Sequence, residues 1–258
     1  MLSSKAHKIP IIVSLTSFPA RINNLWLVIE SMFRQTIQPD KIIVWLSVKQ
    51  FPDIKSVPKN LLRLQERGLE IRLVPDDLRS HKKYIYAMTE YPESIVITID
   101  DDIFYHSNTI QYLIDSHQAY PNDVIANIAH QLKYQSDGSL LPYNDWTHNI
   151  YEPNSTNRIF QVGVGGVLYP PHCAHSDICN AELAYKYCPY GDDIWLYAMC
   201  QLNGTSIRTS ASSFVPLPIY NSHNQSLSSE NLQGRNDEQI HRLIEFCLKN
   251  YHINPFEK

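Results

Sequence analysis

Short apolar runs alternate with segments of helical spacing through the first hundred residues. The apolar runs cover residues 10–15, 41–47 and 94–99, and a further strand is expected at 69–74. The segments with helical spacing cover residues 24–34, 59–67 and 81–90. Each apolar run predicts a buried strand, and apolar side chains on one side of each intervening segment predict a helix. Strands and helices in alternation predict a mainly parallel sheet with helices on both faces.

The second half is less regular. Helices are expected at residues 108–119, 190–202 and 237–250, and a strand at 124–130. Residues 133–157 are rich in Asn, Asp, Ser, Tyr and Pro and predict a long loop, which in a compact domain is usually functional or disordered. An edge strand or strand pair is expected at 206–219 and a polar, mobile segment at 222–235. Because no repeat or linker divides the chain, we expect one domain over residues 1–258.

Three consecutive carboxylates, Asp100, Asp101 and Asp102, follow the fourth predicted strand directly. In an open α/β sheet, ligands bind at the carboxyl ends of the strands, where these acids are expected. Adjacent carboxylates repel one another unless a cation lies between them, and Mg²⁺ and Mn²⁺ prefer such oxygen ligands. Asp100 and Asp102 can flank a common point, with Asp101 directed elsewhere, toward ribose hydroxyls. The other interpretation is a solvated acidic turn that ends the strand.

Two further polar groups stand at a strand end and at a helix start. Thr16, Ser17 and Arg21 follow the first strand, where they can hold a nucleotide base or diphosphate or can mark the start of a helix. Asp192 and Asp193 open a predicted helix after a glycine. A helix N-terminus stabilises an ionised carboxylate, which suits a general base, although plain helix capping gives the same pattern.

A third group follows the third strand. Asp76 or Asp77 can accept a hydrogen bond from a base or ribose, and Lys82 or Lys83 can neutralise phosphate charge. A capped helix start with a solvated basic turn is equally compatible with these residues. His223 lies in a polar segment, where its imidazole can complete a metal shell or can be solvent-exposed.

Composition excludes several classes of protein. Hydrophobic residues make up 43% of the chain and charged residues 19%, which is ordinary for a globular protein. A net charge of −4 argues against a general nucleic-acid binder. Five cysteines without CxxC spacing indicate reduced thiols in a cytosolic protein rather than disulfides or a zinc site. We expect neither a membrane span nor a secretion signal, and no glycine-rich phosphate loop follows a predicted strand.

Together these residues resemble the GT-A glycosyltransferases. The strand that ends in Asp100-Asp101-Asp102 looks like the DxD motif of that fold, and residues 16–21, the glycine segment 160–171 and residues 191–193 occur in the expected order. The likeness is greatest to bacterial glycosyltransferases of surface polysaccharide synthesis and extends to about residue 202. It implies a Rossmann-like α/β fold, with residues 8–106 binding a nucleotide sugar and residues 107–258 forming an acceptor-binding and catalytic half.

The resemblance also implies an activity. Such enzymes pass a sugar from a nucleotide sugar, commonly a UDP-sugar, to an acceptor hydroxyl, here on a surface glycan or its lipid-linked precursor. Asp100 and Asp102, completed by His223, would hold Mn²⁺ or Mg²⁺ against the donor diphosphate. Asp193, with Asp192 in reserve, would deprotonate the acceptor for inversion of the anomeric centre. The nucleoside and diphosphate would be bound by Thr16, Arg21, Asp76 or Asp77, Asp101 and Lys83.

The resemblance extends to the acceptor and to the place of action. Glycines 163–166 would let the backbone approach the sugar, and Trp146, Tyr190 and Trp195 would offer faces to acceptor sugar rings. The enzyme is expected in the cytoplasm, and a lipid-linked acceptor would bring it to the inner membrane leaflet. One departure is that residues 46–48 end the second strand without the acid-rich turn of many members, which leaves the uracil contact to Asp76 or Asp77. The usual Glu-Asp pair is Asp-Asp here.

Two other functions use the same kinds of residue. A sugar nucleotidyltransferase shares the sheet and the metal-binding acids, but it normally has a glycine-rich basic loop after its first strand, and residues 16–21 contain no glycine. A non-catalytic nucleotide- or carbohydrate-binding domain would have no need of Asp192 and Asp193. Stabilisation by UDP only with Mn²⁺, turnover of a sugar phosphate with NTP, and binding without nucleotide release would separate the three.

Overall fold

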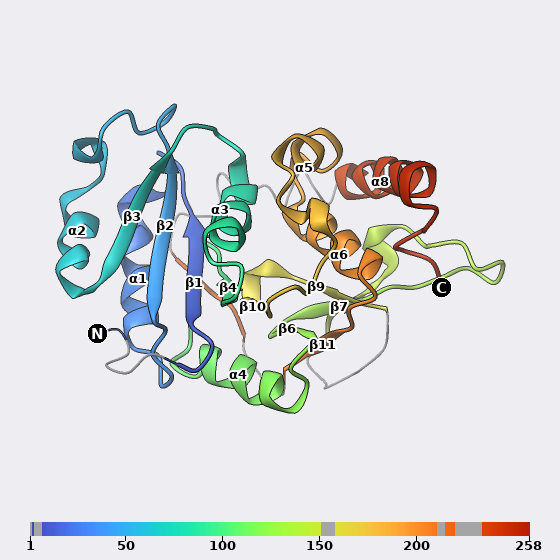
Figure 1. The fold of residues 1–258 in the computed structure, drawn as a ribbon, viewed down its shortest axis with the longest axis horizontal. Coiled ribbons are helices and arrows are strands. Elements are labelled where there is room, and N and C mark those ends of the chain that lie inside the picture. The colour runs from blue at the N-terminus through green and yellow to red at the C-terminus, as the bar shows by residue number, and fades with distance from the viewer. Residues whose placement is uncertain (1, 3–6, 151–157, 211–214, 220–233) are drawn as a thin grey trace.

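A seven-stranded sheet runs through the molecule in the order β11-β6-β10-β4-β1-β2-β3 (Figure 1). The computed structural model describes residues 2, 7–150, 158–210, 215–219 and 234–258. The strands of this sheet are β1 (Ile11–Thr16), β2 (Lys41–Ser47), β3 (Leu69–Val74), β4 (Ile95–Thr98), β6 (Val124–Ala126), β10 (Val167–Tyr169) and β11 (Ile207–Thr209). The first four pair in parallel, which confirms the prediction from the sequence. The fold is mixed α/β, with a mostly parallel sheet flanked by helices.

Alternate apolar side chains of β1 pack into cores on the two faces of the sheet. Ile11, Val13 and Leu15 belong to a core that includes buried residues of α1 (Leu25–Phe33) and α4 (Thr109–Ala119). Ile12 belongs to a second cluster with a residue of α3 (Lys82–Glu90), the helix that contacts β1, β2 and β4. Both faces of the sheet are therefore covered at β1, and its polar Ser14 is buried and accepts a hydrogen bond from Trp45 Nε1 at 2.9 Å.

The predicted strand at 124–130 was wrong, because two strands occupy it. β6 belongs to the large sheet, whereas β7 (Ala129–Gln131) pairs with β8 (Thr147–Ile150) and β9 (Ile159–Gln161) in a separate sheet. Asn127 lies between them, fully buried, and its amide nitrogen donates to the carbonyls of Thr109 and Gly165. These hydrogen bonds from the buried Asn127 side chain to the backbone mark the break between β6 and β7.

The remaining elements are helical or very short. The α-helices not yet named are α2 (Lys59–Leu62), α5 (Ala181–Tyr187), α6 (Asp192–Leu202) and α8 (Asn236–Tyr251). The 3₁₀ segments are η1 (Ile22–Asn24), η2 (Ile54–Ser56), η3 (Arg63–Arg67), η4 (Arg79–His81), η5 (Tyr143–Asp145), η6 (Gly163–Gly165) and η7 (Ser176–Cys179), and the short strands are β5 (Ile103–Phe104) and β12 (Leu217–Pro218). The helix expected at 59–67 changes from α to 3₁₀ after Leu62 and ends, as predicted, at Gly68, whose φ is +102°.

The predicted loop at 133–157 contains η5 and β8 in its described part, so the expectation of a structureless segment was wrong there. Residues 151–157 lie outside the described residues. Most of the polar segment at 222–235, including His223, lies outside them as well. The metal-ligand role of His223 therefore stays a prediction.

Two tryptophans expected to face acceptor sugars belong to the core instead. Trp146 is 3% exposed and Trp195 is 0% exposed, so neither ring can stack on a sugar, and that expectation was wrong. Trp195 lies on α6, almost all of which is buried, and its indole N–H donates to the carbonyl of Ile178 at 2.9 Å. Because most residues of α6 are buried, its sequence does not indicate which aromatic ring faces the cavity and which lies in the core.

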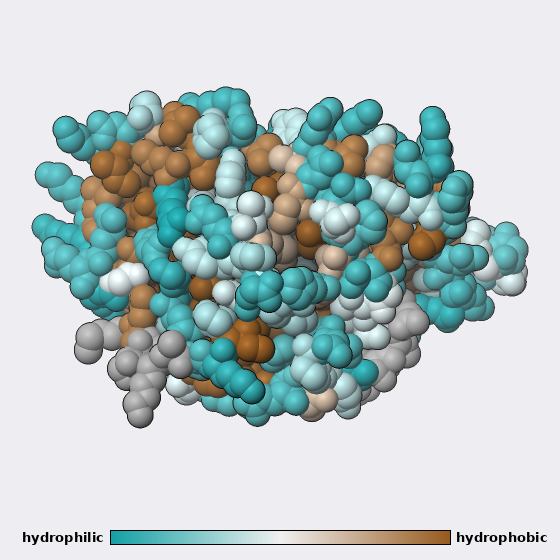
Figure 2. All heavy atoms as spheres, in the orientation of Figure 1, coloured by the Kyte–Doolittle hydropathy of each residue, from teal (hydrophilic) through white to brown (hydrophobic). Residues whose placement is uncertain are grey.

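Hydrophilic and hydrophobic residues are interspersed on the face of the molecule drawn in Figure 2. Hydrophobic residues are more frequent on its left half, where Figure 1 shows β1, β2 and β3. Among the described residues, no helix has both the length and the apolar character that a bilayer crossing requires.

Candidate active site

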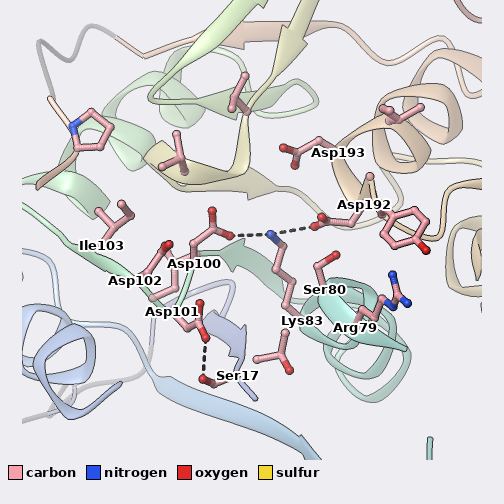
Figure 3. Close-up of a pocket in the computed structure, with 18 of the residues that line it drawn as sticks. Ser17, Arg79, Ser80, Lys83, Asp100, Asp101, Asp102, Ile103, Asp192 and Asp193 are labelled. Atoms are coloured by element: carbon pink, nitrogen blue, oxygen red, sulfur yellow. Dashed lines mark hydrogen bonds and ion pairs between the residues drawn. The ribbon is translucent and has the colours of Figure 1, made fainter. Parts of the chain in front are cut away.

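A cavity of about 840 Å³ opens where β1, β3 and β4 end, and the start of α6 forms part of its wall. It brings together polar residues that are far apart in the sequence (Figure 3). The predicted site residues that line it are Thr16, Arg21, Asp77, Lys83, Asp100, Asp101, Asp102, Asp192 and Asp193. Asp76 does not line it, since its exposed carboxylate pairs with Lys49 at 3.0 Å on the surface. Of the two acids after β3, the structure places Asp77 at the site.

The acidic triplet is partly neutralised by cations of the protein itself. Asp101 is buried, and its carboxylate accepts hydrogen bonds from Ser17 Oγ at 2.6 Å and from Arg21 Nη1 at 2.8 Å. The same Arg21 nitrogen lies 3.0 Å from Asp102 Oδ2. Burial, and next the charge of Asp100, raise the pKa of Asp102 to about 6. Asp100 and Asp102 therefore still repel each other, as a cation-binding pair would before the ion arrives.

Lys83 occupies the centre of the charged cluster. Its side chain is 5% exposed, and its Nζ lies 2.9 Å from Asp100 Oδ1 and 2.8 Å from Asp192 Oδ2 (Figure 3). Burial lowers the pKa of this ammonium, but the charges of Asp100, Asp192 and Asp193 outweigh burial and raise it well above its usual value. Lys83 is thus a permanent buried cation that joins the acids of β4 to those of α6.

Asp193 is held by one hydrogen bond and has a raised pKa. Its Oδ2 accepts from the backbone N–H of Gly163 at 3.0 Å, and Oδ1 receives no hydrogen bond from any residue in the described part of the chain. Burial, and next the charge of Asp192, raise the pKa of Asp193 to about 7. The pKa of Asp192 is lowered instead, because Lys83 outweighs the effect of burial. Two adjacent acids are therefore driven apart in proton affinity, with Asp193 ready to exchange a proton near neutrality.

The first turn of α3 separates two neighbouring lysines. Lys82 turns to Asp77 at 2.7 Å, and Lys83 turns to the Asp100–Asp192 pair. Successive helical residues point about 100° apart, so adjacent cations reach different acids. Burial opposes ionisation of Asp77, but its hydrogen bond and charge interaction with Lys82 lower its pKa overall.

Gln50 lines the same end of the cavity and was missed by the sequence reasoning. Its Nε2 donates to Asp77 Oδ2 at 2.8 Å. Because a carboxylate only accepts, the amide nitrogen must face Asp77 and the amide oxygen must face away. That oxygen, Oε1, is buried and has no hydrogen-bond partner within the described ranges. The sequence signal that could have identified Gln50 is its position three residues after β2, at the strand end that carries an acid-rich turn in many GT-A members.

Aromatic and imidazole rings form another part of the cavity wall. His130 and His148 have ring centroids 4.2 Å apart, and both line the cavity with Tyr143. Burial lowers the pKa of His130 to about 4, so this imidazole is uncharged at neutral pH. No spacing in the sequence linked these residues, because they meet only through the pairing of β7 with β8.

Acids outnumber cations in the described lining of the cavity. It holds six carboxylates and four lysine or arginine side chains: Asp77, Asp100, Asp101, Asp102, Asp192, Asp193, Arg21, Arg79, Lys82 and Lys83. The lining is therefore negative even when Asp193, whose pKa is about 7, is protonated, and a divalent cation such as Mg²⁺ or Mn²⁺ would offset this charge. No group of three or more His, Cys, Asp or Glu close enough to hold a metal occurs among the described residues. Asp100 and Asp102 would therefore be the protein ligands, with phosphate and water oxygens completing the shell, as is common for Mg²⁺.

The glycine segment has reasons within the protein for its glycines. A Cβ on Gly163 would lie 3.1 Å from both Asp193 Oδ1 and Lys83 Nζ, so these charged atoms occupy the space of a side chain. A Cβ on Gly165 would lie 2.7 Å from Ile128 Cγ1, and Gly166 has a φ of +85°. The expected approach of this backbone to a sugar stays a prediction.

The Gly163→Ala variant is expected to lose activity with little loss of stability. Its Cβ would displace the Asp193 carboxylate by a few tenths of an ångström, and such misplacement of a reacting group lowers the rate by about tenfold or more. Turnover and melting temperature measured together check this. The control is Gly204→Ala, which has open space but a φ of +72°, and should lower the melting temperature and leave turnover unchanged. Full activity of Gly163→Ala would contradict the geometry.

The chain matches no protein family model and no curated protein in sequence. Among solved structures it is similar to CMP:2-keto-3-deoxy-manno-octonic acid synthetase complexed with CTP, at 12% identity and a TM-score of 0.48 over 88% of this chain and 100% of that chain. Glucosyl-3-phosphoglycerate synthase from Mycobacterium tuberculosis, in complex with Mn²⁺, UDP-glucose and phosphoglyceric acid, is 17% identical, with a TM-score of 0.36 over 46% and 43% of the two chains. HddC from Yersinia pseudotuberculosis is 12% identical, with a TM-score of 0.37 over 63% and 77%. Likeness at this level carries no information on substrate.

Proposed function

We propose that this protein is a metal-dependent, inverting glycosyltransferase that moves a sugar from a nucleotide sugar to an acceptor hydroxyl. The observation that supports it best is the cavity in which a repelling carboxylate pair, Asp100 and Asp102, faces a carboxylate of pKa about 7, Asp193, across Lys83. Sugar transfer needs a cationic site for the departing diphosphate on one side and a base for the acceptor on the other. This cavity provides for both.

The donor is expected at the ends of β1, β3 and β4. Asp77 and the unpartnered Oε1 of Gln50 both accept hydrogen bonds, which suits the imide N–H of uracil and supports a UDP-sugar. Thr16 lines this region, where its hydroxyl donates to the carbonyl of Trp45 at 2.7 Å. Asp101 holds Arg21 in place, so Arg21 is the group that meets the diphosphate and Asp101 a positioning residue. Mg²⁺ or Mn²⁺ held by Asp100 and Asp102 would supply charge neutralisation of the diphosphate.

The acceptor is expected on the α6 side. Its hydroxyl proton passes to Asp193 Oδ1, the hydroxyl oxygen bonds to the anomeric carbon, and the bond from that carbon to the phosphate oxygen breaks. The nucleoside diphosphate leaves with the electron pair of that bond. Gly163 N–H holds Oδ2 of the base throughout, which keeps Oδ1 directed at the acceptor. Attack from the face opposite the leaving group inverts the anomeric centre. In this proposal the acceptor is a surface glycan or its lipid-linked precursor, handled in the cytoplasm.

A thermal-shift experiment tests the donor half of the proposal. The native protein is expected to gain melting temperature with UDP and Mn²⁺ together and to gain little with either alone, because two carboxylates hold an ion weakly without phosphate oxygens. The Asp102→Asn variant is expected to lose this joint effect, since one of the two ligands becomes a neutral amide.

The matched control is Asp115→Asn, an exposed acid on α4 outside the cavity, which should keep the full shift. Equal stabilisation of Asp102→Asn and the native protein would contradict the metal site. Turnover of a sugar phosphate with NTP would instead assign the cavity to nucleotidyl transfer, and stabilisation without nucleotide release under any acceptor would assign it to binding alone.

A further inference from the structure

Two arginines approach one tyrosine ring at the edge of the cavity. The guanidinium carbon of Arg79 lies 4.3 Å from the ring centroid of Tyr190, and that of Arg235 lies 4.6 Å from the same centroid. The three residues come from η4, from the turn before α6 and from the segment just before α8. Arg79 and Tyr190 line the cavity. None of the three roles assigned so far, which are nucleoside binding, metal binding and proton transfer, uses this group.

The backbone at Arg79 has an unusual conformation that fixes the direction of its side chain. Its φ of +51° lies in the left-handed region, which is unfavourable for arginine, and its N–H donates to Asp77 Oδ1 at 3.2 Å. The conformation directs its side chain to Tyr190 rather than to an acid. Within the described residues Arg79 forms no ion pair with a carboxylate, whereas Arg21, Lys82 and Lys83 all do. It is the one lysine or arginine in the described lining whose charge no acid contacts.

The chemistry of such a group is that of an anion receptor. The N–H edges of a guanidinium match the paired oxygens of a phosphate or carboxylate. Arg79 forms no ion pair with a described acid, so its charge is available for such a contact. Stacking on Tyr190 also orders its long side chain, so less entropy is lost when the anion binds.

The position of the group indicates which reactant would carry the anion. Tyr190 precedes Asp192 and Asp193 by two and three residues, so it lies at the start of the helix that carries the proposed base. In Figure 3, Arg79 and Asp102 are on opposite sides of Lys83. A diphosphate bound at Asp100 and Asp102 would therefore lie across Lys83 from Arg79, whereas Tyr190, on which Arg79 stacks, leads into the helix that carries Asp193.

We propose that Arg79, stacked on Tyr190 beside Arg235, binds an anionic group of the acceptor, a phosphate or a carboxylate. The acceptor is then a hydroxyl compound that carries negative charge, rather than a neutral sugar. This inference rests on the proposed function, because it takes Asp193 to mark the acceptor side.

The test uses the full chain and inorganic phosphate as the probe, titrated by calorimetry into protein saturated with UDP and Mg²⁺. Phosphate is expected to bind, and Arg79→Gln is expected to weaken it about tenfold or more, the scale of one charge-assisted contact. Glutamine has an unbranched side chain, as arginine does, so the left-handed backbone conformation at this position should cost about the same in the variant. An unchanged melting temperature would verify that the variant is folded. The matched control is Arg34→Gln, an arginine 70% exposed on the surface, which should leave phosphate binding unchanged.

Each other outcome has a distinct meaning. If saturating UDP abolishes phosphate binding, the arginines serve the donor diphosphate and the acceptor assignment is overturned. If phosphate does not bind, or binds Arg79→Gln as well as the native protein, there is no anion site at Tyr190. If UDP with Mg²⁺ does not bind at all, the proposed function fails, and the Arg79 dependence of phosphate binding to the free protein then reports on the anion site by itself.

Discussion

The Asp193→Asn variant is expected to bind UDP and metal as the native protein does and to transfer sugar more slowly by a factor of about 10² or more, the scale of a lost general base. An amide has nearly the same size and can still accept from Gly163 N–H, so the site keeps its shape. It cannot take the acceptor proton. Steady-state kcat and the thermal shift with UDP and Mn²⁺, measured on the same preparation, check both halves of this expectation.

The pH dependence follows from the same residue. The base must be ionised to act, and its pKa is raised to about 7, so kcat/KM is expected to fall about tenfold per pH unit below 7 and to level off above it. The residual activity of Asp193→Asn should lack this limb. Full transfer by the variant, or a native profile flat from about pH 5 to 8, would remove Asp193 from the role of base.

Stability should change in the opposite direction from activity. The folded-state pKa of Asp193 lies above its unfolded value, so folding is favoured when Asp193 is protonated, and this contribution is lost as the pH rises through about 7. The amide that replaces the carboxyl group in Asp193→Asn cannot ionise. The variant is therefore expected to melt above the native protein at about pH 8 and closer to it at about pH 5, which distinguishes a strained functional acid from a structural one.

The Lys83→Met variant is expected to lose about 3–5 kcal/mol of unfolding free energy at neutral pH, the usual result of removing one partner from a buried ion pair. Methionine fills a similar volume but leaves Asp100 and Asp192 without the cation that lies 2.9 Å from one and 2.8 Å from the other. Urea denaturation gives the free energy. The matched control is Lys41→Met, whose surface pair with Glu70 is more exposed and should contribute about 1 kcal/mol or less.

The loss should depend on pH with a definite sign. In the native protein, Lys83 keeps the pKa of Asp192 below its usual value, so this stabilisation is present at neutral pH and disappears only when the pH falls through that lowered pKa. In Lys83→Met the freed acids take up protons more easily. The difference between variant and native protein is thus expected to shrink from about pH 7.5 to about pH 5. A loss no larger than that of Lys41→Met at both pH values would mean that Lys83 is not the centre of the cluster.

Predictions from the sequence succeeded where local pattern decides structure. Three apolar runs identified the parallel strands β1, β2 and β4, because strands inside a sheet that is covered on both faces are mostly apolar. β3, at the edge of the sheet, was also predicted although it carries Glu70 and Arg72. The acids after β4 and at the start of α6 were placed at the cavity for a related reason, since carboxyl ends of parallel strands meet at one edge of the sheet.

They failed where a choice depends on segments distant in the sequence. Trp146 and Trp195 were expected at the surface of the site, but their rings complete a core between elements that the sequence does not align. Gln50 was overlooked because only the packing of β2 beside β3 brings it to Asp77. Asp76 and Asp77 were equal candidates until the turn after β3 directed one to solvent and one to the cavity.

The amino-acid sequence by itself determined the first four strands, the helices between them and the end of the sheet where the acids collect, since these follow from hydrophobic period and chain direction. Only the tertiary structure decided which cation neutralises which acid. Lys82 and Lys83 are chemically identical neighbours, and the rotation of one residue along α3 sends Lys83 alone between Asp100 and Asp192. The proton affinity of Asp193 depends on that arrangement, because burial and nearby charge, rather than residue type, set its pKa.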